Sequence, residues 1–183
     1  MHTFPVLYEV NSKEELLGQV NSVNDSLVEF YRKVPDSMLF SEAVPEGWTI
    51  AQNMNHIIST NKMFAFWFSL PNFILKLRGK PSKIQLKLEE IKPTNRAFIL
   101  DYGSYEVSKT PKSNEAKKEK LLNEIIQSNQ RLVLEIQKKS ELELEEFSSL
   151  FGGMNLKVGV LFLLKHNIHH SNVAKLRLDH SKI

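Results

Sequence analysis

Apolar residues recur at a spacing of three to four positions in four separate stretches of this chain, the pattern of a helix with one buried face. Two of these stretches begin at S/T-x-x-E/Q capping boxes, Ser12 with Glu15 and Thr49 with Gln52. The expected helices run from Ser12 to Pro35, from Thr49 to Pro71, from about Leu121 to Ser140, and from Asn155 through Leu176. The pattern predicts an all-α protein.

The connections between these stretches differ in length. The first and last connections are about 14 and 15 residues long, whereas about 40 residues separate the second stretch from the third. A single long crossover lets two successive helices of a bundle run parallel. We therefore expect one domain over residues 1–183, a four-helix bundle with a long crossover connection between helices 2 and 3. Residues 71–115 form this basic connection, and the fragment Ala97 to Gly103 is interpreted as part of it.

Composition excludes several classes of protein. The chain has 183 residues, no cysteine and 42% hydrophobic residues, which fits one domain without disulfides, zinc fingers or iron–sulfur clusters. The net charge is only +3, although residues 71–120 carry 12 of the 24 basic and 6 of the 21 acidic residues. The aromatic residues of that basic stretch are not interleaved with its basic residues in positions suited to base stacking, so we expect no nucleic acid partner.

The N-terminus also bears on localisation. It has no basic region followed by a long apolar run, and no stretch contains 18 uninterrupted apolar residues. We expect a cytoplasmic protein with a small-molecule substrate and no membrane partner. A homodimer is left open.

The last helix carries a histidine pair with the spacing of metal ligands. His166 and His170 are four residues apart and lie on one mostly apolar face, whereas His169 falls about 60° from His166 on the other side. Imidazoles that face a core need partners, and a metal ion is one such partner. Hydrogen-bonded core histidines explain the pair equally well. Asn167 stands where the glutamate of an H-E-x-x-H zinc site would be.

His56 is the best third ligand that the sequence offers. Small polar residues on its side of the second helix, among them Gln52, Asn53 and Thr60, are suited to orient ligand rings or water. The strongest apolar stripe of that helix, however, is displaced from His56 by about 100°, so an ordinary surface histidine is an equal alternative.

Two segments resemble motifs of a known family. The first is Gly47-Trp48-Thr49-Ile50-Ala51-Gln52 followed by Asn55-His56-Ile57, and the second is Gly153-Met154-Asn155-Leu156-Lys157-Val158 followed by His166-Asn167-Ile168-His169-His170. They are similar to the W-[ST]-x-x-[EQ]-x-x-x-H signature and the fourth-helix H-x-x-x-H element of the DinB-like family of four-helix metalloproteins. The resemblance implies a divalent metal, usually zinc or nickel, on His56, His166 and His170, with His169 as a neighbour.

The resemblance also implies a range of activities. The family includes thiol S-transferases and isomerases, metal-dependent hydrolases, and members without an assigned reaction. We expect a metal-dependent enzyme that activates a thiol, with a low-molecular-weight thiol as cosubstrate and the cluster of Lys76, Arg78, Lys80 and Lys83 as its binding site for acidic groups. The alternatives are a hydrolase, which the absence of Asp and Glu from residues 49–70 and 156–178 disfavours, and a non-enzymatic binding module with Met63 and Trp67 lining its pocket.

Overall fold

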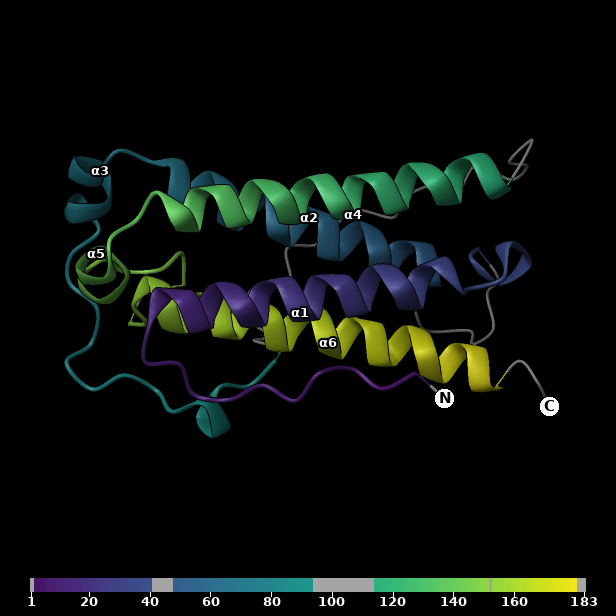
Figure 1. Ribbon diagram of the computed structural model, residues 1–183, viewed down its shortest axis with the longest axis horizontal. Coiled ribbons are helices and arrows are strands. Elements are labelled where there is room, and N and C mark those ends of the chain that lie inside the picture. The colour runs from purple at the N-terminus through teal and green to yellow at the C-terminus, as the bar shows by residue number, and fades with distance from the viewer. Residues whose placement is uncertain (1, 41–47, 94–113, 152, 181–183) are drawn as a thin grey trace.

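The computed structural model describes residues 2–40, 48–93, 114–151 and 153–180 (Figure 1). Four long helices make up most of it: α1 (Lys13–Arg32), α2 (Ile50–Ser69), α4 (Asn114–Gln137) and α6 (Leu156–His180). No strand occurs within these ranges; the nearest feature is an isolated antiparallel bridge between Ser148 and Asn155. The predicted all-α bundle is confirmed.

The helices are arranged so that α2 and α6 are neighbours. α2 packs against α4 and α6, and α1 packs against the same two helices. α1 and α6 run in one direction while α2 and α4 run in the other (Figure 1). The successive helices α2 and α4 are therefore parallel, as the long crossover between them predicted.

Local capping explains where three of these helices begin. The Thr49 hydroxyl accepts a hydrogen bond from the Gln52 backbone while the Gln52 side chain accepts one from the Thr49 backbone, a complete capping box. The Asn155 side chain caps α6 by accepting from the Val158 N–H. Ser12 caps α1, but the expected reciprocal bond differs, because the Glu15 carboxylate accepts from the Asn11 N–H instead.

The connections contain short helices that the sequence interpretation did not include. The crossover holds α3 (Asn72–Leu77) and the 3-10 helix η2 (Leu88–Glu90), and α5 (Glu141–Glu146) precedes α6. A further 3-10 helix, η1 (Asp36–Met38), follows α1. The crossover lies against α6 near η2, because the Lys165 ammonium donates to the carbonyls of Leu88 and Ile91. The fragment 97–103 lies outside the described residues.

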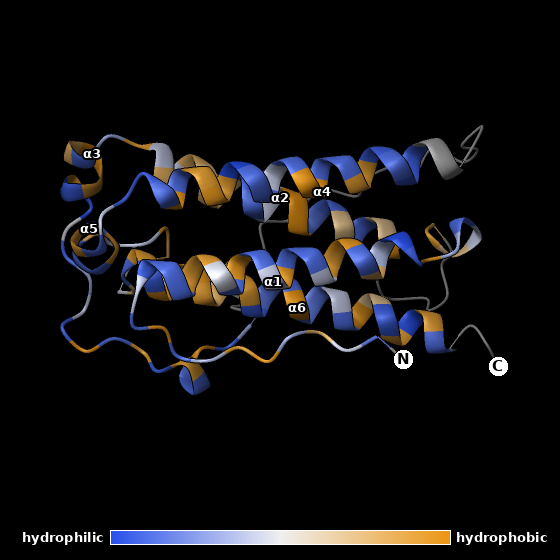
Figure 2. Cartoon of the chain, in the orientation of Figure 1, coloured by the Kyte–Doolittle hydropathy of each residue, from blue (hydrophilic) through white to orange (hydrophobic). Residues whose placement is uncertain are grey.

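The core extends along the whole bundle, and α6 is its most enclosed element. Five consecutive residues of α6, 160–164, are buried, so this stretch of the helix has no solvent-facing side. In α1, by contrast, exposed hydrophilic positions alternate with buried, mostly apolar ones, and Figure 2 shows this helix in alternating hydrophilic and hydrophobic bands. In the ranges that the structure describes, no helix combines the length and the apolar character needed to cross a bilayer.

Candidate metal centre

Three imidazoles meet between α2 and α6. His56 comes from the second turn of α2, and His166 and His170 come from the middle of α6. One ring nitrogen from each of the three lies within 4.8 Å of the others. The Nε2 atoms of His56 and His166 are 2.8 Å apart, and the ring of His170 lies 4.5 Å, between centroids, from each of the other two. The structure thus brings together the three histidines that the resemblance implied.

Two of the imidazoles are held from behind by oxygen atoms. Nδ1 of His170 donates to Oδ1 of Asn53 at 2.9 Å, and Nδ1 of His166 donates to the carbonyl of Pro93 at 2.8 Å, once each ring takes its Nδ1–H tautomer. Asn53 is itself oriented by donating its amide to the Thr49 carbonyl. A carbonyl or amide oxygen on Nδ1 is the usual support of a metal-ligating histidine, because it leaves the Nε2 lone pair available.

Burial keeps these imidazoles neutral. Desolvation, reinforced by the nearby His166, lowers the pKa of His56 to about 4. Desolvation and the three neighbouring imidazoles of His166, His56 and His169 lower the pKa of His170 to about 2. The pKa of His166 is lowered by burial, although the Pro93 carbonyl opposes that shift. Neutral rings are the form that binds a cation, because each neutral imidazole keeps one nitrogen lone pair.

Trp48 is a site residue that the sequence interpretation did not select. Its indole stacks on His170 at 5.5 Å with an interplanar angle of 17°, and it meets His56 edge-on at 4.9 Å. The side chain is 38% exposed, so it forms a wall between the imidazoles and solvent. The signal was present in the sequence, because Trp48 opens the motif that carries the resemblance.

Two other polar candidates of α2, Gln52 and Thr60, hydrogen-bond to the backbone of their own helix and its N-cap. The Gln52 side chain is committed to the capping box at Thr49. The Thr60 hydroxyl donates to the backbone carbonyls of His56 and Ile57 within its own helix. Asn53, which was also predicted to orient the site, hydrogen-bonds directly to the ring of His170.

His169 lies beside the three imidazoles and outside their group. Its ring meets His170 edge-on at 5.4 Å between centroids. Among the described residues, the group whose nitrogen atoms converge contains His56, His166 and His170, and His169 is not in it.

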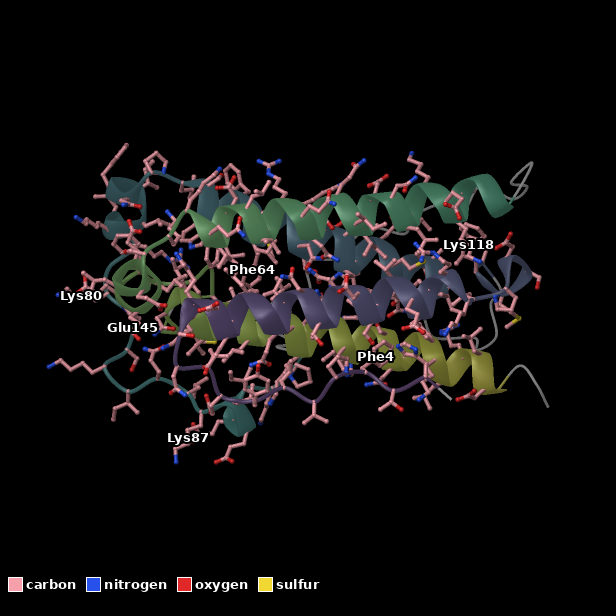
Figure 3. The ribbon with its side chains drawn as sticks, viewed as in Figure 1. Phe4, Phe64, Lys80, Lys87, Lys118 and Glu145 are labelled. Atoms are coloured by element: carbon pink, nitrogen blue, oxygen red, sulfur yellow. The ribbon has the colours of Figure 1, made fainter. Side chains whose placement is uncertain are left out.

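The aromatic candidates lie toward the C-terminal end of α2, and the basic candidates lie in the crossover that follows it. Trp67 follows His56 by 11 residues, about 16 Å along the helix. Its indole donates to the Ser148 carbonyl and carries the guanidinium of Arg78 at 5.5 Å. Met63 is partly buried against the core. Figure 3 shows Lys80 at this same end of the bundle, so neither the aromatic nor the basic cluster is part of the imidazole site.

The donor set fits a divalent cation. Three neutral imidazoles leave the charge of a bound ion undiminished, and no carboxylate joins their group within the described residues. Three protein nitrogen ligands with one position left open is the arrangement of catalytic zinc sites. The two buried acceptors behind the rings complete the support that such ligands require.

Comparison with known proteins bears on the same residues. Residues 19–174 match the family model of the DinB superfamily, a span that includes Trp48 and all three histidines. No curated protein and no solved structure gives a significant match. The family match confirms the resemblance that the two motifs indicated.

Proposed function

Because the chain belongs to the DinB superfamily, we propose that it is a metal-dependent enzyme whose divalent ion, zinc or nickel, is held by His56, His166 and His170. We propose further that it is a thiol S-transferase or a related isomerase that acts on a small electrophilic molecule. The observation that carries this proposal is the convergence of three neutral imidazole nitrogens within 4.8 Å, with oxygen acceptors behind two of the rings.

The ion would supply a cationic site that lowers the pKa of a thiol or water at its open position. The chain favours the thiol, because hydrolysis benefits from a carboxylate base near the ion. Residues 49–70 and 156–178, which include most of α2 and α6, contain no Asp or Glu. A thiol with a lowered pKa is a nucleophile without a general base, so the lack of a carboxylate matters less for thiol transfer.

The residues of this chain have separate roles in the proposal. Asn53 and the Pro93 carbonyl fix the tautomer and direction of two imidazoles. Trp48, stacked on His170 and partly open to solvent, excludes water from one side of the site and offers an apolar face to a substrate.

Metal analysis of ligand variants tests the site. Protein purified without an affinity tag should contain about one divalent ion per chain. His56→Ala, His166→Ala and His170→Ala should each lose most of it, because two imidazoles bind an ion far more weakly than three. The control is His169→Ala, whose ring is also at the site but outside the converging group, and which should keep the ion. Retention of the ion by all three ligand variants would disprove the assignment.

Turnover assays separate the candidate reactions. The metal-loaded protein is incubated with low-molecular-weight thiols and a panel of electrophiles, and separately with ester and amide substrates. Thiol-dependent turnover that disappears in His170→Ala supports the transferase. Hydrolysis without thiol would favour the hydrolase, and saturable binding of a small molecule without turnover would favour a binding module.

A further inference from the structure

A chain of three buried asparagines crosses the bundle beside the candidate metal centre. The amide of Asn61 on α2 donates to Oδ1 of Asn129 on α4 at 2.5 Å, and the amide of Asn167 on α6 donates to Oδ1 of Asn61 at 2.9 Å. Their exposed fractions are 0% for Asn61, 4% for Asn129 and 1% for Asn167. Two side-chain hydrogen bonds thus join three helices through the core.

Stability alone does not account for these three hydrogen-bonded asparagines. Burying a carboxamide costs free energy that its hydrogen bonds recover only in part, and apolar residues of the same shape are often as stable. The hydrogen bonding of the three asparagines is also incomplete at both ends of their series. Nδ2 of Asn129 and Oδ1 of Asn167 are buried without a hydrogen-bond partner among the described residues. A better documented use of buried polar side chains is to fix the register of packed helices.

α6 is a helix whose register needs fixing. Residues 160–164 are all buried, so the apolar pattern of this stretch of α6 does not favour one rotation about the helix axis over another. A helix with a single apolar stripe is oriented by that stripe, whereas α6 requires a directional contact. The hydrogen bond between Asn167 and Asn61 is such a contact, because it is satisfied at one rotation and one axial position.

The asparagine chain also lies where register matters most. Asn167 is the residue after His166 and comes three before His170, and Asn61 follows His56 by five residues. The same pair of helices, α2 and α6, therefore carries both the Asn61–Asn167 bond and the three imidazoles. Metal–ligand distances vary by only about 0.2 Å, so a small slip of α6 along α2 would spoil the convergence of the rings.

We infer that Asn61 and Asn167 are positioning residues that set the register of α6 on α2 and so bring His56, His166 and His170 to one point. This inference rests on the proposed metal site for its functional meaning. Asn129 has a different part, since it ties α2 to α4, and α4 carries none of the three imidazoles.

Two matched variants test the inference. Asn167→Leu and Asn129→Leu keep the branching of the side chain and each removes one hydrogen bond to Asn61. Both should lower the thermal midpoint by a similar amount, about 2–12 °C, because each leaves one polar atom of Asn61 unpaired in the core. Only Asn167→Leu should weaken zinc binding, by about the 10–100-fold typical of residues that orient ligands. Zinc titration against a competing chelator measures the dissociation constant.

Equal zinc affinities in the two variants, whether both unchanged or both weakened alike, would overturn the inference and leave a purely structural role. If Asn167→Leu does not fold, the triple replacement of Asn61, Asn129 and Asn167 by Leu removes every orphaned atom. It should fold with a midpoint near that of the wild type yet bind zinc at least 10-fold more weakly; wild-type affinity in this variant would also refute the inference.

A metal-free measurement separates this inference from the proposed function. Nitrogen-15 spectra of the imidazoles in chelator-treated protein report the hydrogen bond between Nε2 of His56 and Nε2 of His166, which lie 2.8 Å apart. If the wild type binds no zinc, the metal proposal fails, but Asn167→Leu should still disturb these resonances while Asn129→Leu leaves them in place. Unperturbed imidazole resonances in Asn167→Leu would contradict the positioning role itself.

Discussion

The lowered histidine pKa values predict that the metal-free protein loses stability as the pH falls from 6.5 toward 4. In the unfolded chain each imidazole takes up a proton near its ordinary pKa of about 6.5. In the folded chain His56 does so only near pH 4 and His170 near pH 2, since burial disfavours the charged ring. The unfolded state therefore binds more protons throughout this range, and acidification favours it.

The size of the effect follows from those values. At pH 5 a histidine with a folded pKa near 4 or below disfavours folding by about 2 kcal/mol relative to neutral pH. His56 and His170 together give a ceiling of about 4 kcal/mol, and partial solvent access, greatest for His56, reduces this to about 2 kcal/mol. His166 adds to the loss in the same direction. A change of this size is readily measured against a total stability of about 5–15 kcal/mol.

Urea unfolding of chelator-treated protein at pH 7.5 and pH 5.0, followed by circular dichroism, measures the loss. Carboxylates elsewhere also titrate in this interval, so the comparison is with the double variant His56→Gln, His170→Gln. The wild type should lose about 2 kcal/mol more than the variant between the two pH values. Equal losses would show that the two imidazoles are not kept neutral by the folded protein.

Two further predictions concern single side chains. Replacing Asn53 by Leu removes the oxygen that orients His170, and zinc affinity should fall about 10–100-fold while the fold is retained; unchanged affinity in a zinc titration would contradict this role. Gly159→Ala should lower the free energy of unfolding by about 1–3 kcal/mol, because the new Cβ would lie 2.6 Å from Cβ of the buried Ser149. Gly18→Ala is the control: nothing lies within 4 Å there, and the better helix propensity should raise stability by about 0.5–1 kcal/mol in the same denaturation assay.

Three helix starts could be predicted because local contacts set them, whereas α4 begins at Asn114, seven residues before the expected Leu121. The caps at Ser12, Thr49 and Asn155 join residues only three apart, so the sequence alone contains both partners. The short helix α5 was equally accessible, since Ser140 and Glu143 form a complete capping box. The spacing of His166 and His170 was likewise a local signal, because four residues bring two side chains to one helical face.

The position of His56 was not decided by its own helix. Its displacement from the apolar stripe left the surface and the core equally open. α2 packs against two neighbours, α4 and α6, and His56 lies on the side that meets α6. The helical wheel describes one buried face, whereas a bundle helix between two neighbours buries a wider one.

What the sequence determined by itself was the four long helices, the caps of three of them and the histidine pair, because each depends on residues close together in the chain. Only the tertiary structure decided which residues contact the histidines and their helix. Trp48 stacks on His170, the Pro93 carbonyl accepts from His166, and Asn61 is hydrogen-bonded to Asn167. These contacts join residues separated by 73 to 122 positions, and their partners are chosen by how the helices pack. Periodicity states which face of a helix is apolar; it does not state which atoms of another helix will lie opposite.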